Sequence, residues 1–510
     1  MLAPEQILSR LDDRFRLLTG GARTALPRQR TLRATIDWSH DLLSATEKAL
    51  LARLSVFAGG WTMEAATAVA GGDWAVPDDA LFDALASLVD KSLVAVELAG
   101  AGRRYRLLES TRQYAREKLA ERGDADGDRR HAQYLARRFE QADRTWPVTP
   151  TATWLEACAP ELDNLRAALA WCFGPEGDPD LGVALFASTG PYWIQLSLQG
   201  EFRRWRKVAM AQVSERLPPR VAGRIRLLDA QAGSPGDPAF VESAQRAVAL
   251  ARQAAEPDLL GRALTHLAYL VRPHDAGAAA AQLEEAERVL RPLGRTKSLA
   301  ALLSVLGGSA HLRGDLPAAR SHYAEAIGIS RELGDFLGYA APSFNQVDDD
   351  FNAGQVDAAI AAAGELVEQC RRHRGLGLLG LMLFYYGDYL LAADRPAEAR
   401  AVGVEGLRLN RSLGRSAPVN ACVETVALAT ALEGAPDRAA RLAGYVEAFY
   451  ASVSFVRGAT QQRTWERLRA VLDESLGADE VARRMAEGAA WSEERAVDAA
   501  LNAAAERVEP

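Results

Sequence analysis

The sequence predicts a mainly α-helical fold in which a small domain with one β-hairpin precedes a long array of helical repeats. Two observations support this fold class. The segments 92–98 and 103–108 alternate like strands and are joined by Ala-Gly-Ala-Gly, where Gly supplies the backbone freedom that a tight turn needs. Further along the 510 residues, similar segments return every 40 residues, which is typical of stacked helix pairs.

Composition places the chain among ordinary globular proteins. Hydrophobic residues make up 48% and charged residues 25% of a length that predicts two to four domains. The net charge of −7 argues against a general nucleic-acid binder. The 4 cysteines lie far apart without a CxxC pair, which fits reduced thiols and gives no zinc site. We therefore expect a cytoplasmic protein without a bound metal.

Helices surround the predicted hairpin on both sides. Ser44 followed by Glu47 forms a capping-box pattern that starts a helix running through Phe57. Further helices are predicted over 62–70 and 78–91 and from Glu109 onward. Three helices followed by a two-stranded wing are typical of a winged-helix domain, which we place at residues 33–125.

The rest of the chain repeats with a fixed register. The segments GDLPAA, GQVDAA, DRPAEA and GAPDRA begin at positions 314, 354, 394 and 434. The same period places small residues at Ala279, Ala319, Ala359, Ala399 and Ala439, and Leu-Gly pairs at 293–294, 333–334 and 413–414. Small residues let paired helices approach closely, and Gly makes the corner between them. The pattern predicts a tetratricopeptide-type α-solenoid over 181–475, with connecting helices at 126–180 and C-terminal helices at 476–510.

One apolar stretch, residues 375–393, is long enough to resemble a membrane span. Asp388 lies inside it, Gly recurs, and the repeat register passes through it. The sequence therefore favours a buried helix pair and no membrane contact.

Catalytic and cofactor motifs are missing from the sequence. No GxxxxGK[ST] loop occurs, so the backbone cradle and the Lys that hold nucleotide phosphates are not supplied. The one GxGxxG match, at 375–380, follows a charged helix end instead of a strand, which indicates an inter-helix corner. The 7 histidines are scattered. We expect a protein that is not an enzyme and has no cofactor.

Two clusters are candidate partner-binding sites on the repeats. Asp348, Asp349 and Asp350 form the sharpest acidic cluster; a solvated helix face is the favoured interpretation, and a contact for a basic partner in the concave groove is the alternative. The aromatic residues Tyr192 and Trp193 are expected to pack the first repeats, or else to line a ligand pocket.

The helix in the DNA-reading position of the winged helix is acidic. Residues 78–91 carry Asp78, Asp79, Asp83 and Asp90 against Lys91, whereas groove-reading helices need cationic or amide side chains. The wing does carry Arg103, Arg104 and Arg106, which are candidate contacts to a DNA backbone. Direct DNA binding is thus disfavoured but kept as the alternative function.

With these residues in view, the chain resembles a large bacterial family. The segments LAPEQILSRLDDRFRLL, RTLRATIDWSHDLLSATEKALLARLSVFAGG, LVDKSLVAVE, YRLLESTRQYAREKL and WLEACAPELDNLRAALAWC are similar to STAND-class regulators, often named LuxR-family ATPase-type transcription factors. The resemblance implies an NB-ARC ATPase, then a winged helix, then tetratricopeptide repeats. It also implies that residues 1–32 are the remnant of the NB-ARC helical subdomain and that the family's ATP site lies upstream of Met1.

These observations lead to two competing function hypotheses, and a catalytic ATPase is kept as a third that the sequence supports least. In the first, the chain is a non-enzymatic regulatory module whose repeats bind a protein partner or small-molecule inducer, while the winged helix acts as an intramolecular lever. In the second, it is a transcription factor that binds DNA through the winged helix. The resemblance further predicts a truncated or split gene product, or a start codon placed too late, and an upstream ATPase or DNA-binding polypeptide as partner.

Overall fold

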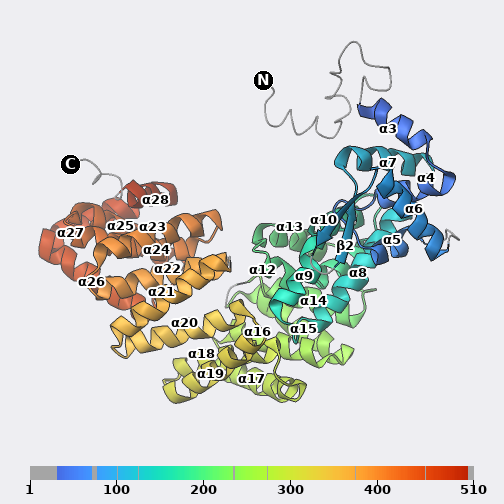
Figure 1. The fold of residues 1–510 in the computed structure, drawn as a ribbon. Helices are drawn as coiled ribbons and strands as arrows, with labels where there is room; N and C mark the ends of the chain where they lie inside the picture. The colour runs from blue at the N-terminus through green and yellow to red at the C-terminus, as the bar shows by residue number, and fades with distance from the viewer. Residues whose placement is uncertain are drawn as a thin grey trace, which may run out of the picture. The chain divides into compact units, whose positions relative to one another are not determined.

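The computed structural model describes residues 32–71, 77–99, 102–124, 126–233, 236–272, 274–373, 375–453 and 455–502. The predicted NB-ARC remnant at 1–32 lies outside these ranges apart from Leu32, as does the centre of the hairpin turn. The chain divides into two compact units (Figure 1). The first comprises Met1–Tyr192 and Arg203–Leu259, and the second comprises Trp193–Phe202 and Leu260–Pro510.

The described residues are mainly helical, as predicted. The elements of the winged-helix and connecting region are α3 (Leu32–Asp41), α4 (Ala45–Leu54), α5 (Met63–Ala70), α6 (Asp78–Asp90), β1 (Ala95–Ala99), β2 (Gly102–Arg106), α7 (Glu109–Glu121), α8 (Gly127–Thr145), α9 (Thr151–Cys158), η2 (Ala159–Glu161) and α10 (Leu162–Cys172). The following elements are α11 (Pro179–Ala187), α12 (Gly190–Gln195), α13 (Gln199–Met210), α14 (Pro219–Ala230), α15 (Pro238–Ala254), α16 (Pro257–Val271), α17 (Ala276–Leu290), η3 (Arg291–Leu293) and α18 (Lys297–Leu312). The remaining helices are α19 (Leu316–Glu332), α20 (Phe336–Asn352), α21 (Val356–Arg372), α22 (Leu376–Ala392), α23 (Pro396–Ser412), α24 (Ser416–Leu432), α25 (Pro436–Ser452), α26 (Ala459–Leu476), α27 (Ala478–Ala489) and α28 (Glu493–Asn502).

The winged helix consists of α4, α5, α6 and the hairpin β1–β2. Its predicted capping box is confirmed: the Glu47 amide donates to Ser44 Oγ at 3.2 Å, and the Ser44 amide donates to Glu47 Oε2 at 2.7 Å. Strands β1 and β2 pair antiparallel, with Val96 opposite Tyr105. Trp61 adds a single antiparallel bridge to Tyr105, so the segment between α4 and α5 is joined to the wing.

The hairpin starts later than the sequence predicts. Ser92 adopts a left-handed φ of 57°, and the Leu93 amide donates to the Leu88 carbonyl. Residues 92–94 thus close the end of α6, and β1 begins only at Ala95. The polar alternation of the sequence could not distinguish this helix-closing turn from the first residues of a strand.

The repeat register is confirmed residue by residue. From α19 to α25 the helices are 17 residues long and are joined by three-residue corners. The repeated alanines are 0–1% exposed: Ala279, Ala319, Ala359, Ala399 and Ala439. The predicted corner glycines adopt positive φ: Gly294, Gly334 and Gly414. Asp394 takes the left-handed conformation, with φ of 58°, at the corner where the repeat has Asp in place of Gly.

The apolar stretch 375–393 forms the single helix α22, so the expected helix pair is wrong. Asp388 is buried within it and accepts a hydrogen bond from the Thr425 hydroxyl at 2.8 Å. Among the helices of the described residues, none is both long and apolar enough to cross a membrane.

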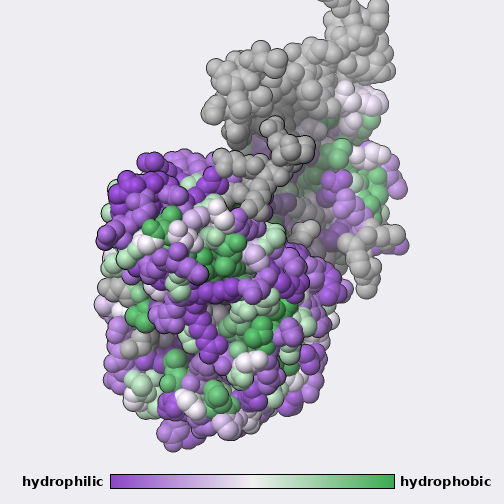
Figure 2. Space-filling model, turned by 90° about the vertical axis from the view of Figure 1, so that its left-hand side faces the viewer, coloured by the Kyte–Doolittle hydropathy of each residue, from purple (hydrophilic) through white to green (hydrophobic). Residues whose placement is uncertain are grey.

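At the C-terminal end, α25 and α27 approach at two glycines. A Cβ on Gly444 would lie 2.0 Å from the Met485 carbonyl oxygen, and one on Gly488 would lie 1.8 Å from the Arg441 carbonyl oxygen. The two backbones are therefore in direct contact. The surface seen in Figure 2 is largely hydrophilic, with hydrophobic residues in separate small groups.

Candidate functional site

The three aspartates predicted as a cluster have three different environments. Asp348 Oδ1 accepts hydrogen bonds from the Tyr389 hydroxyl at 2.9 Å and the Thr460 hydroxyl at 2.6 Å. Asp350 forms a surface ion pair with Arg320 at 2.7 Å. Because consecutive residues of a helix point about 100° apart, neighbours in sequence diverge in space.

Asp349 is only 5% exposed, so the expectation of a solvated face is wrong for this residue. Its Oδ1 lies 2.5 Å from His311 Nδ1 on α18, while its Oδ2 is buried without a hydrogen-bond partner among the described residues. Burial raises the pKa of Asp349, and the neighbouring His311 opposes that rise. Sequence reasoning missed His311 because it lies 38 residues away on another repeat.

Helix α26 packs across α20, α22 and α24, which form one row of the array. Thr460 bonds Asp348, and Arg467 bonds the Leu391 carbonyl and Asp394. Leu468 is fully buried in the same core. A helix of the same chain therefore covers this part of the row formed by α20, α22 and α24.

Two buried carboxylates lie beneath this helix. Burial raises the pKa of Asp388 well above its usual range, which hydrogen bonds from Thr425 and Thr464 only partly oppose. Burial also raises the pKa of Glu424 to about 7, although Arg457 donates to it at 2.8 Å. Thr464 of α26 and Arg457, which lies just before this helix, donate hydrogen bonds to these carboxyl groups. The burial and the hydrogen bonding of both groups therefore depend on α26.

A cavity of about 410 Å³, which we call the array pocket, opens beside this covered region. Helices α16, α18, α19, α20 and α22 supply its lining, which includes Tyr269, Arg272, His311, Tyr323, Asp349 and Tyr385. The pocket thus contains carboxylate, guanidinium, imidazole and phenol groups from helices far apart in sequence. Such a volume falls within the roughly 300–1,000 Å³ typical of small-molecule sites.

The predicted aromatic pair Tyr192 and Trp193 is fully buried, so direct contact of either side chain with a partner is excluded in this structure. The Tyr192 hydroxyl donates to the Ala159 carbonyl at 3.2 Å, and its ring lies edge-on to Phe139 and Trp154. Both side chains are therefore buried, as the favoured interpretation requires, but these neighbours of Tyr192 belong to α8, α9 and η2 and not to the repeats.

The face of the winged helix that would read DNA is acidic. Asp79, Asp83 and Asp90 of α6 are all exposed. Lys91 pairs with Glu47 at 2.5 Å, so the cation that follows this helix is already engaged. Burial would raise the pKa of Glu47, but hydrogen bonds from Lys91, Ser87 and Ser44 lower it to about 2.

The three wing arginines do not act as one basic patch. Arg103 is exposed, and Arg106 forms a half-exposed pair with Glu97. The side chain of Arg104 is 13% exposed; it donates to Glu161 at 2.9 Å and to the Gly60 carbonyl at 2.6 Å. Arg104 is thus a wrong prediction as a DNA contact, because its donors are directed into the protein.

Asn164 of α10 completes this anchorage. Its side-chain amide donates to the Gly60 carbonyl at 2.9 Å and to Glu161 at 2.7 Å, while its carbonyl accepts from the Gly59 amide at 2.9 Å. We call Arg104, Glu161, Asn164 and the Gly59–Gly60 backbone the wing anchor. No sequence pattern indicated it, because its members come from three separate stretches of the chain, with Gly60 lying 44 residues from Arg104 and 104 residues from Asn164.

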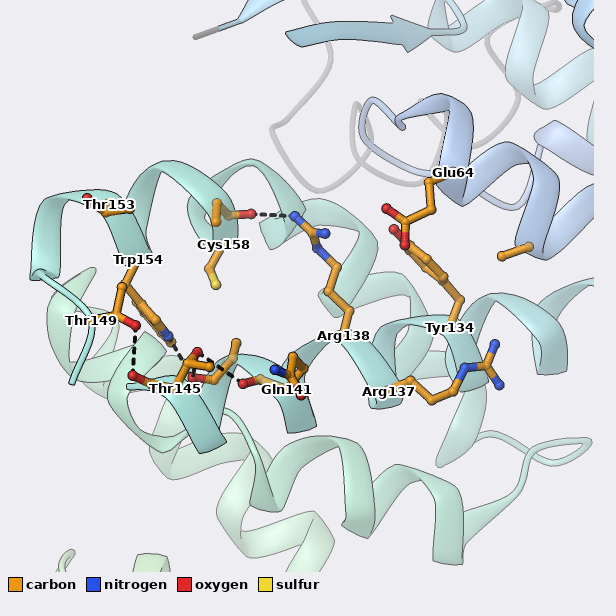
Figure 3. A pocket seen from close by; sticks show the side chains of 13 residues that line it. Glu64, Tyr134, Arg137, Arg138, Gln141, Thr145, Thr149, Thr153, Trp154 and Cys158 are labelled. Carbon is orange, nitrogen blue, oxygen red and sulfur yellow. Dashed lines mark hydrogen bonds between the residues drawn. The ribbon is translucent and has the colours of Figure 1, made fainter. Parts of the chain in front are cut away.

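A second cavity, of about 500 Å³, lies between α5 and helices α8 and α9 (Figure 3). Arg138 reaches from α8 to the Ala157 carbonyl at 2.6 Å, and Glu64 faces Tyr134 (Figure 3). Burial raises the pKa of the Cys158 thiol to about 11, so this thiol is not a ready nucleophile. Within the described ranges no group of three or more His, Cys, Asp or Glu could hold a metal ion.

Comparison with known proteins agrees with this geometry. Residues 43–120 match the family described as winged helix-turn-helix domain. This match agrees with the helices α4, α5 and α6 and the hairpin β1–β2 described above. The chain is also 38% identical over 344 residues to putative HTH-type transcriptional regulators of Mycobacterium tuberculosis and Mycobacterium bovis, covering 66% of this chain. It spans only 38% of the length of these curated relatives.

Two further similarities concern parts of the chain and its fold. An uncharacterized Mycobacterium tuberculosis protein is 50% identical over 125 residues, which is 24% of this chain and 32% of that protein. The crystal structure of a STAND protein with a tetratricopeptide repeat sensor from Pyrococcus horikoshii matches with a TM-score of 0.50 at 14% identity, covering 94% of this chain and 67% of that chain. The predicted order of winged helix and repeat array is therefore confirmed at the level of fold, while the LuxR-family label stays a prediction.

Proposed function

We propose that this chain is a non-enzymatic regulatory module of a transcriptional regulator. Its repeat array binds a protein partner or small inducer, and its winged helix acts as an intramolecular lever. The observation that carries the proposal is the wing anchor, in which Arg104 contacts Glu161 and the Gly60 carbonyl. The similarity to putative HTH-type regulators supports a role in transcription, and the array supports a role in binding.

A lever needs a rigid connection at the point where force is passed on. Glu161 is 2% exposed and Asn164 is fully buried, so their hydrogen bonds are shielded from water. A displacement of α10 would then pull on the Gly59–Gly60 segment and, through the Trp61–Tyr105 bridge, on the wing. A wing that bound DNA would need its arginines to be exposed, and this connection instead holds Arg104 inside the protein.

Hydrogen exchange tests the lever. Glu161→Gln weakens the charge-assisted bonds of Arg104, so we expect faster amide exchange in residues 59–61 and 102–106. Glu156→Gln, at an exposed position of the same connecting region, is the matched control and should leave exchange there unchanged. Equal exchange in both variants would contradict a lever that acts through this anchor.

A second candidate function is direct DNA binding, which the winged helix-turn-helix match and the exposed Arg103 favour. We expect only weak binding that is independent of sequence and lost at moderate salt, because phosphate contacts alone are screened. A footprint over one defined site at physiological salt would establish this second function instead.

We further propose that the chain by itself neither binds nor hydrolyses ATP and acts in the cytoplasm. The lack of a GxxxxGK[ST] loop in the sequence supports the first point, and four free, buried cysteines support the second. Saturable binding of a fluorescent ATP analogue at micromolar concentration would contradict the first.

A further inference from the structure

We propose that the array pocket binds a small zwitterion, a molecule with an ammonium group near one end and a carboxylate near the other. This inference rests on the proposed function and deepens it by naming the chemistry of the inducer. It depends on four features of the second unit: the region left uncovered by α26, an unpartnered carboxylate oxygen, an unpaired guanidinium and a tyrosine wall.

The first feature is the position of the cavity. Helix α26 covers α20, α22 and α24, and Asp348 beneath it is engaged by Tyr389 and Thr460. The array pocket is lined in part by residues of α16 and α18, which are not among the helices that α26 packs against closely. Asp348, which α26 contacts through Thr460, also lines the pocket. A ligand can therefore occupy the pocket while α26 stays in place.

The second feature is the acceptor for a cation. The side chain of Asp349 is 2% exposed and its Oδ2 has no hydrogen-bond partner among the described residues. A buried acceptor without a donor is unfavourable, because it has lost its hydrogen bonds to water. An ammonium group of a ligand would supply that donor together with the opposite charge, and the carboxylate of Asp348 is adjacent.

The third feature is a cation placed to receive a carboxylate. Arg272 lines the same pocket, and its guanidinium lies 5.7 Å from the centre of the Tyr269 ring. No carboxylate of the described residues lies within ion-pair distance of it. Since a guanidinium binds carboxylates through paired hydrogen bonds, Arg272 defines the anionic end of the ligand.

The fourth feature is the aromatic part of the pocket lining. Tyr269, Tyr323 and Tyr385 present aromatic surface to the cavity. Aromatic faces attract ammonium groups and pack against methylene chains. The pocket thus offers an anionic end, an apolar wall and a cationic end, which a zwitterion with a short carbon chain complements.

A matched series of five-carbon molecules tests the inference by calorimetric titration of the full chain. The zwitterion 5-aminovalerate is compared with cadaverine, which carries two ammonium groups, and glutarate, which carries two carboxylates; β-alanine and 6-aminohexanoate vary the distance between the ammonium and the carboxylate. We expect at least one zwitterion to bind, and more tightly than either cadaverine or glutarate. The proposal fails if no zwitterion binds with a Kd of about 1 mM or lower, or if cadaverine binds as tightly as the best zwitterion.

Variants locate the site. Asp349→Asn and Arg272→Gln should each weaken binding of the best zwitterion at least tenfold. Asp350→Asn is the control, because Asp350 pairs with Arg320 outside the array pocket, and it should bind as the parent does. Circular dichroism establishes that each variant is folded, and if Asp349→Asn is not, Arg272→Gln alone decides. Parental affinity in a folded Arg272→Gln would overturn the assignment.

The same samples separate this inference from the proposed function. If the zwitterion binds but hydrogen exchange at the wing anchor responds to neither ligand nor Glu161→Gln, the lever is wrong and the pocket stands. If Glu161→Gln loosens the wing but no zwitterion binds, the pocket assignment is wrong and the lever stands.

Discussion

The winged-helix region and the repeat array are stabilised in different ways. The first depends on single long-range contacts such as Arg104 with Glu161, Arg130 with the Val69 carbonyl, and Asn164 with the Gly60 carbonyl. The array depends on one small residue used again at every crossing, such as Ala359. The difference teaches that a repeat spreads its stability over equivalent positions. The winged-helix region instead adds long-range polar contacts, each made once, to an apolar core that includes Leu50, Leu54 and Trp61.

The largest effect is expected where two backbones touch at the end of the array. Gly488→Ala would place a Cβ 1.8 Å from the Arg441 carbonyl oxygen, and a backbone cannot move aside as a side chain can. We expect a loss of about 3 kcal/mol or more in the free energy of unfolding, measured by urea denaturation. Gly377→Ala, a helical glycine with open space around its Cβ, should instead gain a few tenths of a kcal/mol or more.

The next effect concerns the wing anchor. Arg104→Ala removes the 2.9 Å ion pair of Glu161, whose side chain is 3% exposed, and leaves this buried carboxylate with only the Asn164 amide at 2.7 Å and the more distant Arg138 at 3.9 Å. We expect a loss of about 3 kcal/mol in the free energy of unfolding. Arg103→Ala removes an exposed side chain one position away and should change stability by less than about 0.5 kcal/mol. Equal denaturation midpoints for the two variants would show that the wing is not anchored.

A smaller effect tests the register of the array. Ala359 is 1% exposed, and Ala359→Leu forces three extra carbons into a helix crossing, at a cost of about 1–3 kcal/mol. If the repeats contribute equally to stability, Ala319→Leu and Ala399→Leu should reduce the free energy of unfolding by about as much as Ala359→Leu does. Thermal melts of the three variants decide this, and a parental melt for any of them would show that its crossing is loosely packed.

The smallest effect distinguishes the two units by pH. Burial lowers the pKa of His131 to about 3 from its usual 6.5. As the pH falls below about 6.5, the unfolded state therefore binds a proton that the native state does not bind, and the free energy of unfolding decreases. The first unit should thus lose about 1.4 kcal/mol at pH 5.5 relative to its stability well above pH 7. His131→Phe keeps a ring against Phe57 and should remove this loss.

In the second unit, Glu424 should change the free energy of unfolding in the opposite direction when the pH is lowered. Its pKa is raised to about 7 from 4.5, so the native state keeps a proton that the unfolded state has released, and stability falls as pH rises through that window. Hydrogen exchange of peptides from each unit, corrected for intrinsic rates, measures both responses. Parallel losses in the two units on acidification would contradict this assignment.

The sequence predicts what is periodic or local and misses what is long-range. The alanine period places Ala359 correctly, and the capping box places the start of α4, because each depends on spacing along one stretch of chain. The wing anchor and the contact between His311 and Asp349 depend on residues brought together from separate elements. The three adjacent aspartates are likewise predicted as one cluster, because adjacency in the sequence does not show that consecutive side chains of a helix point in different directions.

Helix α26 also constrains the order of events during synthesis. The ribosome completes α20, α22 and α24 before residues 459–476 are synthesised. Asp348, Asp388 and Glu424 are therefore exposed to water until α26 packs on these helices. In water these carboxyls are ionised at neutral pH, but burial raises the pKa of Asp388 and Glu424 in the finished protein. We therefore expect docking of the last array helix to be accompanied by proton uptake and to be favoured by acidic conditions.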